Sequence, residues 1–393
     1  GGGLDWQAVE TGSTMTAVAG NGYWIDTTSN ACTITLPASA SNGDEIMFAD
    51  YARNWGTNGI VIDSNGLNYQ GDDDSYDVEY STDGQSVNIV YSGATNGWIP
   101  IEDDTVEDVP IKLNDEGIFG FGYPNTAVTN LVSNTGVVAS DVAGVGTIRS
   151  NLAACEYGGD KGIFAFGHGV STYTEVTNLV SNAGVVSSDV AIVSSTGRQA
   201  LAACGYGEDK GIFGFGSATT AATNLVSNAG VVASDTAGVG TARYYPAACE
   251  YGGDKGIFGF GDTGSKVSMT NLVSNAGVVA TDTAGVGTAR SSLAACSFGG
   301  DKGIFGFGTT GSYTAVTNLV SNSGVVASDV AGVGTARLGV AACEYGGDKG
   351  IFGYGYDGSN YSMTNLVSNV GVVASDVAGV GTARYGLAAC SFN

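Results

Sequence analysis

The chain is poor in basic side chains, proline and histidine. Its 393 residues hold 14 Lys and Arg against 38 Asp and Glu, a net charge of -24, which excludes a basic footprint for binding nucleic acid. With 5 Pro, and with 64 Gly that follow no three-residue period, the sequence is not collagen-like. The single His, His168, leaves no second His for a catalytic pair.

Long apolar runs are missing as well. No run approaches the roughly 20 residues that span a bilayer, and no basic segment leads into an apolar one near residue 1, so we expect no membrane insertion. Apolar residues make up 43% of the chain, which is too many for a disordered protein. We therefore expect a buried core.

Charge divides the chain into two parts. Residues 1–110 hold 18 acidic side chains and one basic one, whereas residues 111–393 hold 20 and 13. All four Trp lie in the first part, and the second part is repetitive. We predict an N-terminal module at 1–101, an acidic linker at 102–116 and a repeat domain at 117–393.

The repeat domain contains six copies of one unit. Gly-Ile-Phe-Gly-Phe-Gly, or a one-residue variant, recurs every 45 to 49 residues, and each copy continues with Thr-Asn-Leu-Val-Ser-Asn, a Val-rich stretch and an Arg. The copies begin at Gly117, Gly162, Gly211, Gly256, Gly303 and Gly350. The Arg residues are Arg149, Arg198, Arg243, Arg290, Arg337 and Arg384.

Each unit reads as four antiparallel strands. In the fullest copy the predicted strands are 340–345, 350–355, 362–368 and one beginning at Val372, with turns at 346–349 and 369–371. Four strands in about 47 residues is typical of one blade of a β-propeller. The fold class we predict is therefore all-β, with a small N-terminal β domain followed by a six-bladed β-propeller.

The ends of the repeat region predict how the propeller closes. The Ala-Ala-Cys strand occurs six times, but no copy precedes Gly117, and the sixth copy ends the chain. We expect the strand at 387–392 to pair with the strand at Gly117, so that one blade is built from both ends of the domain. An open solenoid would carry polar capping repeats instead.

Two resemblances follow from these motifs. The order of Arg, apolar strand, Gly-Gly-Asp-Lys turn and aromatic-Gly strand over residues 111–393 resembles kelch-type β-propeller repeats. The units lack the Trp of kelch blades and have Phe-Gly-Phe-Gly in place of a Gly-Gly doublet. Glycine-rich repeats of this kind are similar to those of bacteriophage virion proteins, which implies a place on the virion.

The N-terminal module is also predicted to be β. Its strand-like runs are 31–37, 45–48, 60–63, 86–92 and 98–101. The phrases Thr-Ile-Thr-Leu-Pro from Thr33, Gly-Asp-Glu-Ile from Gly43 and Gly-Trp at Gly97 resemble a module of phage tail-fibre and appendage proteins. The resemblance implies that residues 1–101 attach the chain to other virion proteins or make a homo-oligomer.

Most recurring side chains have a structural interpretation. Each repeat Cys stands alone, without a His or second Cys at ligand spacing, so we expect small packed residues near the axis and neither a metal nor another cofactor. The Asp-Lys turns, the Arg and the recurrent Asp are expected to fix turns and bridge blades. The recurrent Asp residues are Asp141, Asp189, Asp235, Asp282, Asp329 and Asp376.

Two acidic groups have a chemical alternative. Asp72, Asp73, Asp74, Asp77 and Glu79 offer hard oxygen ligands for Ca²⁺ but lack the spacing of a calcium loop, which favours a solvated turn. The loop carboxylates that do not recur are those that a glycosidase would need: Glu175, Asp262 and Asp357. They fall in separate blades, so we predict that the chain is not an enzyme.

The loops that differ between repeats are the predicted binding site. In an antiparallel meander the second-to-third connections and the junctions after each Arg lie at one end of every blade. This end is rich in Tyr, whose rigid ring and polar tip suit sugars or proteins. The candidate ligand-binding residues are Tyr123, His168, Tyr173, Tyr244, Tyr245, Tyr313, Tyr356, Tyr361 and Tyr385.

These features predict a phage virion structural protein on the particle surface. We expect it to be a tail fibre or similar appendage, whose propeller loops bind a host-surface glycan or receptor. One alternative is a purely structural decoration or filament subunit whose acidity keeps particles apart. The other is a propeller glycosidase.

Overall fold

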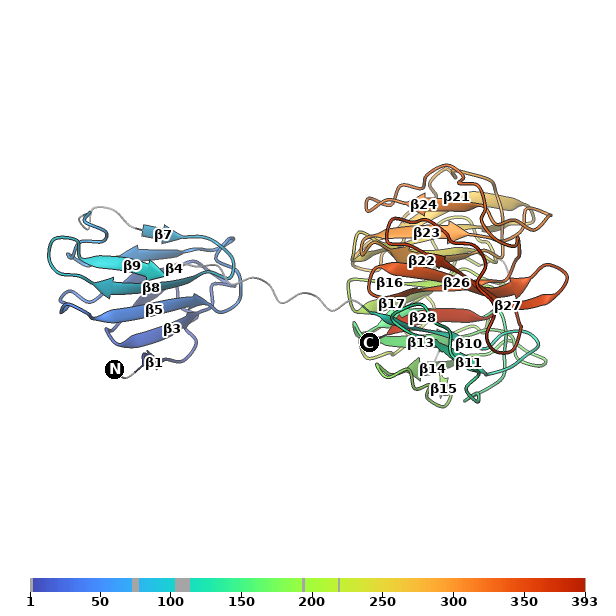
Figure 1. Cartoon of the computed structure of the whole chain (residues 1–393), viewed down its shortest axis with the longest axis horizontal. Coiled ribbons are helices and arrows are strands. Elements are labelled where there is room, and N and C mark those ends of the chain that lie inside the picture. Colours follow the sequence, from blue (N-terminus) through green and yellow to red (C-terminus); the bar gives the residue numbers. More distant parts are fainter. Residues whose placement is uncertain (1–2, 73–77, 103–113, 193–194, 218–219, 393) are drawn as a thin grey trace. The chain divides into compact units, whose positions relative to one another are not determined.

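The computed structural model describes residues 3–72, 78–102, 114–192, 195–217 and 220–392. These residues contain strands and turns but no helix, which confirms the all-β prediction (Figure 1). Accordingly, no helix in the described part of the chain could cross a membrane. The chain divides into two compact units, residues 1–111 and 112–393. The predicted linker at 102–116 lies mostly outside the described residues, and its last residue, Glu116, already belongs to a strand of the second unit.

In its described residues, the N-terminal unit consists of two sheets, and the chain passes repeatedly from one to the other. Strands of the first sheet are β1 (Asp5–Trp6), β3 (Asn21–Ile25), β5 (Glu45–Asp50), β8 (Ser86–Tyr91) and β9 (Trp98–Glu102). Strands of the second are β2 (Thr14–Thr16), β4 (Cys32–Thr35), β6 (Ile60–Asp63) and β7 (Val78–Tyr80). The first three strands of each sheet run parallel, and the later ones are antiparallel.

Alternating burial explains how these two sheets form one core. Side chains of β4 and β6 alternate between buried and half-buried, as expected of strands with one face turned inward. The fully buried Ile34, Phe48, Trp55 and Trp98 fill the core. The five strands predicted here correspond to β4, β5, β6, β8 and β9. We did not predict β1, β2 and β7, which are only two or three residues long, or β3, which begins with Asn-Gly.

The second unit consists of six small sheets in the described residues. The first sheet joins strands from both ends of the domain: β28 (Ala388–Phe392), β10 (Glu116–Gly120) and β11 (Thr129–Val132). The next two are β12 (Ala153–Tyr157), β13 (Lys161–Ala165), β14 (Val176–Val180) and β15 (Val190–Ala191), and β16 (Ala202–Tyr206), β17 (Lys210–Gly214) and β18 (Thr223–Val226). The last three are β19 (Ala247–Tyr251), β20 (Lys255–Asp262) and β21 (Lys266–Val273); β22 (Ala294–Phe298), β23 (Lys302–Gly306) and β24 (Thr317–Val320); and β25 (Ala341–Tyr345), β26 (Lys349–Tyr356) and β27 (Asn360–Val367).

Each sheet has three full strands rather than the four that we predicted. The fourth segment pairs through isolated bridges, such as Val367 with Val373 and Thr364 with Val377, and only β15 forms a short strand there. These segments are rich in Gly and other small residues, which fill a pleated surface poorly. Gly379 lies so close to Ser362 that an added Cβ would come within 2.4 Å of the Ser362 backbone, so no larger residue fits there.

The strand at the end of the chain closes the set of sheets, as predicted. β28 pairs antiparallel with β10, from Phe392 opposite Glu116 to Ala388 opposite Gly120. The inner strands β12, β16, β19, β22, β25 and β28 then contact one another in that order, and β28 contacts β12. The sheets therefore form a closed ring.

A circle of backbone hydrogen bonds runs around this ring at its centre. The second residue after each Arg donates its N–H to the carbonyl of the equivalent residue one repeat earlier, with N···O distances of 2.6 to 3.2 Å. The circle closes because Asn151 donates to Gly386, the equivalent residue of the last repeat, at 2.6 Å. All six residues have left-handed backbone, with φ from 51° to 64°. In chain order they are Asn151, Ala200, Tyr245, Ser292, Gly339 and Gly386.

Glycine and cysteine fit neighbouring sheets together. The Sγ of Cys249 on β19 lies against Gly303 of the next sheet, and a Cβ at Gly303 would come within 2.5 Å of it. In the opposite direction, the ring of Phe305 fills the space above Gly259. The Gly–Cys pair recurs in all six sheets, and the Gly–Phe pair recurs in five, with Ala165 at the equivalent position of the sixth. Contact between sheets therefore selects the motif glycines. All seven Cys are free and buried, which confirms the packing interpretation of the repeat Cys.

Buried arginines form a second link between sheets. Arg243 is fully buried, with its guanidinium 4.0 Å from the centre of the Phe215 ring. It donates to the carbonyl of Phe260 at 2.7 Å and to Oδ1 of Asn271 at 2.7 Å, both in the next sheet. A planar guanidinium can stack and donate in a fork at the same time, which a lysine cannot do. All six repeat Arg stack on the equivalent ring.

The recurrent Asp forms a third link. Asp282 accepts hydrogen bonds from the backbone N–H and the hydroxyl of Thr241 in the preceding repeat, at 2.9 and 2.6 Å, and from Asn271 in its own. Thr382 donates in the same way to Asp141, so this set also closes on the first repeat. The expected role of the recurrent Arg and Asp in bridging repeats is confirmed.

We expect Gly303→Ala to lower the free energy of unfolding by about 1–3 kcal/mol, the usual cost of overpacking a core. The reason is the contact with Cys249 Sγ, so Cys249→Ala in the same chain should restore part of the loss. Denaturant unfolding of the two single variants and the double variant measures the coupling. Strictly additive losses would show that this contact does not limit the packing.

Candidate functional site

The ring has two chemically different ends. At one end, which we call the uniform end, lie the Gly-Gly-Asp-Lys turns and the Asn-X-Gly turns. At the other, the varied end, lie the second-to-third loops and the junctions after each Arg. Isolated bridges join loop and junction at the varied end, as between Ser150 and His168 and between Leu338 and Tyr356. The predicted grouping of the variable segments is therefore seen in the structure.

The uniform end is held by repeated turn contacts. Lys255 pairs with Asp254 beside it, and Asn275 donates to the same Asp254 carboxylate at 3.1 Å. The Gly252 N–H bonds the backbone carbonyl of Asp301 in the next turn at 2.7 Å. In the first sheet Asp115 supplies the equivalent carbonyl, so the chain enters the ring at the uniform end.

Four of the predicted tyrosines meet at the varied end. The ring centres of Tyr123 and Tyr385 are 5.3 Å apart, those of Tyr385 and Tyr356 are 5.0 Å apart, and Tyr313 lies 6.3 Å from Tyr356. Backbone hydrogen bonds between Tyr123 and Tyr385, at 2.7 and 3.1 Å, fix the first pair. Tyr123 is 50% exposed and Tyr313 is 39% exposed. These residues come from both ends of the repeat domain and form one aromatic surface only because the ring is closed.

The other predicted residues form smaller groups. His168 and Tyr173 lie edge to face at 5.6 Å, and Tyr244 and Tyr245 do so at 5.5 Å. Burial raises the pKa of Tyr245, and charge repulsion from Tyr385, Tyr244 and Tyr173 raises it further. Tyr361 does not join the cluster, because its hydroxyl donates to Asp357 at 3.1 Å.

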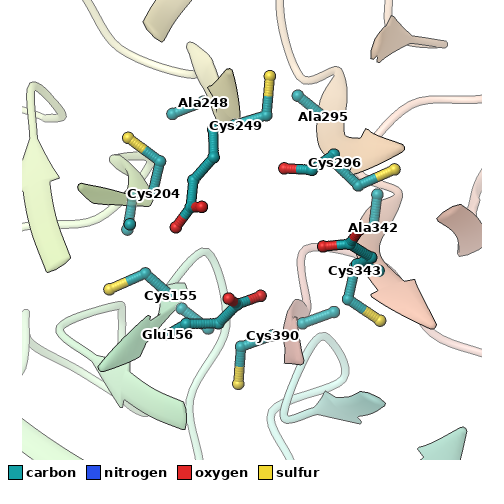
Figure 2. A pocket seen from close by; sticks show the side chains of 17 residues that line it. Cys155, Glu156, Cys204, Ala248, Cys249, Ala295, Cys296, Ala342, Cys343 and Cys390 are labelled. Carbon is teal, nitrogen blue, oxygen red and sulfur yellow. The ribbon is translucent and has the colours of Figure 1, made fainter. Parts of the chain in front are cut away.

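The inner strands line a narrow channel on the ring axis, with a volume of about 50 Å³. The six Cys side chains point outward from it into the sheets, while Glu156 points toward its centre (Figure 2). At the position after each Cys, Glu alternates with a small residue. In chain order these residues are Glu156, Gly205, Glu250, Ser297, Glu344 and Ser391. The first five of them line the channel.

Alternation of large and small residues lets three glutamates share this channel. Glu250 occupies the space above Gly205, where an added Cβ would overlap its carboxylate. Burial raises the pKa of Glu250 well above its usual range, and repulsion from Glu156 and Asp254 raises it further. Burial also raises the pKa of Glu156, although hydrogen bonds from Ser391 and Asn114 oppose the effect. The channel therefore favours protonated glutamates.

The loop carboxylates of the glycosidase alternative are each engaged in their own sheet. Glu175 accepts from the Gly197 N–H at 2.9 Å, Asp262 pairs with Lys266 at 2.5 Å, and Asp357 holds Tyr361. None of the three contacts another. Among the described residues no His, Cys, Asp and Glu side chains are grouped to hold a metal ion. Of the proposed calcium cluster, residues 73–77 lie outside the described residues.

Sequence reasoning missed two sets of residues. The circle of left-handed residues includes Asn151 and Ser292, which had no recognisable motif because their role depends on backbone contacts between repeats. The channel glutamates had a signal: the residue after each Cys reads Glu, Gly, Glu, Ser, Glu, Ser around the six repeats. Alignment of the repeats by this position would have found them.

Comparison with known proteins identifies no relative: no model of a protein family matches the chain, and no curated protein does so either.

We expect Glu250→Gln to stabilise the folded chain at pH 8 by about 1–3 kcal/mol, because folding then no longer requires a buried carboxylate to take up a proton. The folded-state pKa lies above the ordinary 4.5, so the folded state holds a proton that the unfolded state releases, and wild-type stability falls as the pH rises above that value. The benefit of the substitution should vanish near pH 4.

Thermal unfolding across this pH range, with Glu208→Gln as control, provides the measurement. Glu208 lies exposed in a turn at the uniform end, so its substitution removes a carboxylate without touching the channel. Equal pH profiles for wild type and Glu250→Gln would contradict a buried, proton-holding glutamate.

Proposed function

We propose that the second unit is a six-bladed β-propeller and that the chain is a bacteriophage virion protein, a tail fibre or similar appendage. In this proposal the varied end of the propeller binds a glycan on the host surface. The observation that carries the proposal is the contrast between the two ends. One end repeats the same turns around the ring, whereas the other combines unlike loops into a connected tyrosine surface.

The chemistry of the varied end supports binding without turnover. The contiguous rings of Tyr123, Tyr385, Tyr356 and Tyr313 offer apolar faces with hydroxyls at their edges, which suits the apolar faces and hydroxyls of sugars. Glu175, Asp262 and Asp357 already have partners within their own sheets, so these three offer no pair for acid–base chemistry. Rigid aromatic side chains on a fixed scaffold lose little conformational freedom on binding.

The N-terminal unit supplies a different surface, which we assign to attachment. Trp6 and Trp24 stack with ring centres 4.2 Å apart and remain 39% and 38% exposed. The Trp6 ring covers Gly22, where a Cβ would lie 2.7 Å from it. Exposed Trp is typical of the residues that dominate binding energy in protein interfaces. We propose that this unit contacts another virion protein or a second copy of the chain.

A structural decoration role is the second candidate, and a ring of exposed valines favours it. One valine in each repeat lies at the uniform end with 64% to 66% of its surface exposed. These residues are Val137, Val185, Val231, Val278, Val325 and Val372. A ring of six exposed apolar side chains suits contact with a neighbouring subunit of the particle.

Substituting Tyr123, Tyr313, Tyr356 and Tyr385 together with Ser tests the two candidates. If the varied end binds the host, the variant should bind host cells at least tenfold more weakly, because four aromatic contacts are lost. Binding of fluorescently labelled chain to cells provides the readout. The matched control replaces Val137, Val231, Val278 and Val325 with Ser at the uniform end.

The two variants separate the candidates. Loss of cell binding in the tyrosine variant alone supports receptor binding. Normal cell binding in that variant, together with failed incorporation of the valine variant into particles, favours decoration and overturns the leading proposal. Antibody labelling of the second unit on cells or in medium, but not on particles, would contradict the virion assignment.

A further inference from the structure

A cavity of about 200 Å³ lies on the ring axis at the varied end. It is separate from the glutamate channel, because its lining residues are the second and third residues after each repeat Arg together with two residues that directly follow an Arg. The third residues form an apolar floor, and each is buried. They are Leu152, Leu201, Pro246, Leu293, Val340 and Leu387.

The wall of the cavity is the circle of left-handed residues described above. Its backbone is fixed by six hydrogen bonds, yet its side chains differ: Asn, Ala, Tyr, Ser, Gly and Gly. Left-handed backbone suits Gly and is tolerated by Asn, but it is unfavourable for Ala200, Tyr245 and Ser292. A residue other than Gly or Asn that is kept in a left-handed backbone conformation indicates that its side chain has a role.

Two glycines of the circle make room for polar groups of the neighbouring wall residues. A Cβ at Gly386 would lie 2.6 Å from Oδ1 of Asn151, and a Cβ at Gly339 would lie 3.1 Å from the ring of Tyr385. The amide of Asn151 and the ring of Tyr385 therefore lean over the two glycines. Tyr245 stands on the wall between Ala200 and Ser292. The six-fold backbone thus encloses an asymmetric cavity.

The lining contains no charged side chain, although the chain as a whole carries a net charge of -24. Hydrogen-bonding groups sit on the wall, in Asn151, Tyr245, Ser292 and Tyr385, while the floor is apolar. The cavity is smaller than the roughly 300–1,000 Å³ of sites for drug-sized ligands. These properties fit one small neutral ring with an apolar face and several hydroxyls.

We propose that this axial cavity binds a single neutral hexose unit at the end of a glycan chain. The apolar face of the sugar rests on the floor, Tyr245 and Tyr385 flank it, and Asn151 and Ser292 hydrogen-bond its hydroxyls. Anionic sugars are excluded, because the lining has no cation to pair with a carboxylate in this acidic protein. This inference rests on the proposed function and names the ligand class at the same end of the ring.

Titration of the full chain with the methyl glycosides of glucose, galactose and mannose tests the inference. Ligand-observed NMR and calorimetry should detect one binding site for at least one of them, and none for the methyl glycoside of glucuronic acid. Tyr245→Ala should weaken the interaction at least tenfold. Val278→Ser is the matched control, because Val278 is exposed at the uniform end, outside the cavity lining.

A second variant fills the cavity without disturbing the backbone circle. Ala200→Asn adds bulk at a left-handed position where Asn is better tolerated than Ala, and Asn151 already occupies the equivalent position. This variant should fold with at least wild-type stability and lose glycoside binding. Unchanged binding in folded Ala200→Asn, or equal binding of the glucuronide, would overturn the inference.

The outcome also separates this inference from the proposed function. If no neutral glycoside binds but host-cell binding still requires the varied-end tyrosines, the cavity assignment is wrong and the receptor role stands. If a glycoside binds through Tyr245 while cell binding is independent of the varied end, the cavity assignment stands and the receptor role is wrong.

Discussion

Pairing of β28 with β10 is the constraint on which the rest of the second unit depends. Without it the guanidinium of Arg384 would lose the Phe121 carbonyl and the Asn130 side chain, and would be left buried with donors unpaired. The central circle of backbone hydrogen bonds would lack its link between Asn151 and Gly386. The arginine contacts and the backbone hydrogen bonds each form a closed circle around the ring. Pairing of the two ends of the repeat domain completes both circles.

In the closed ring, the residues that stabilise the fold and the residues that differ between repeats occupy different positions. Contacts between neighbouring sheets use Gly, Cys, Phe, Arg and Asp at the same positions around the ring, and those contacts tolerate little change in side-chain volume. The side chains that differ between the second-to-third loops at the varied end are not among these recurring contacts. The scaffold can therefore carry unlike side chains on one end, which is the arrangement that a recognition surface needs.

On the ring axis the repeats carry different side chains at equivalent positions, because six identical large side chains would crowd one another there. Six glutamates would not fit the channel, and three already disfavour one another's charge. Alternation of Glu with Gly205, Ser297 and Ser391 relieves the crowding. At the varied end the circle of left-handed residues likewise keeps one backbone conformation while its side chains differ, which produces a cavity with distinct sides.

The sequence alone determined the all-β class, the six copies and the closing strand, because these follow from short-range pattern and from counting motifs. It also placed the tyrosines at one end, since an antiparallel meander brings alternate loops together. It did not reveal the parallel strands of the N-terminal unit, because a strand carries the same alternation in either direction.

The predicted fourth strand of each repeat forms mostly isolated bridges. Pairing there depends on how its small residues pack and not on the local sequence pattern. The cluster of Tyr123, Tyr356 and Tyr385, the channel glutamates and the axial cavity required the tertiary structure. Each of them depends on which residues meet across the closed ring, and these contacts join positions up to about 260 residues apart in the chain.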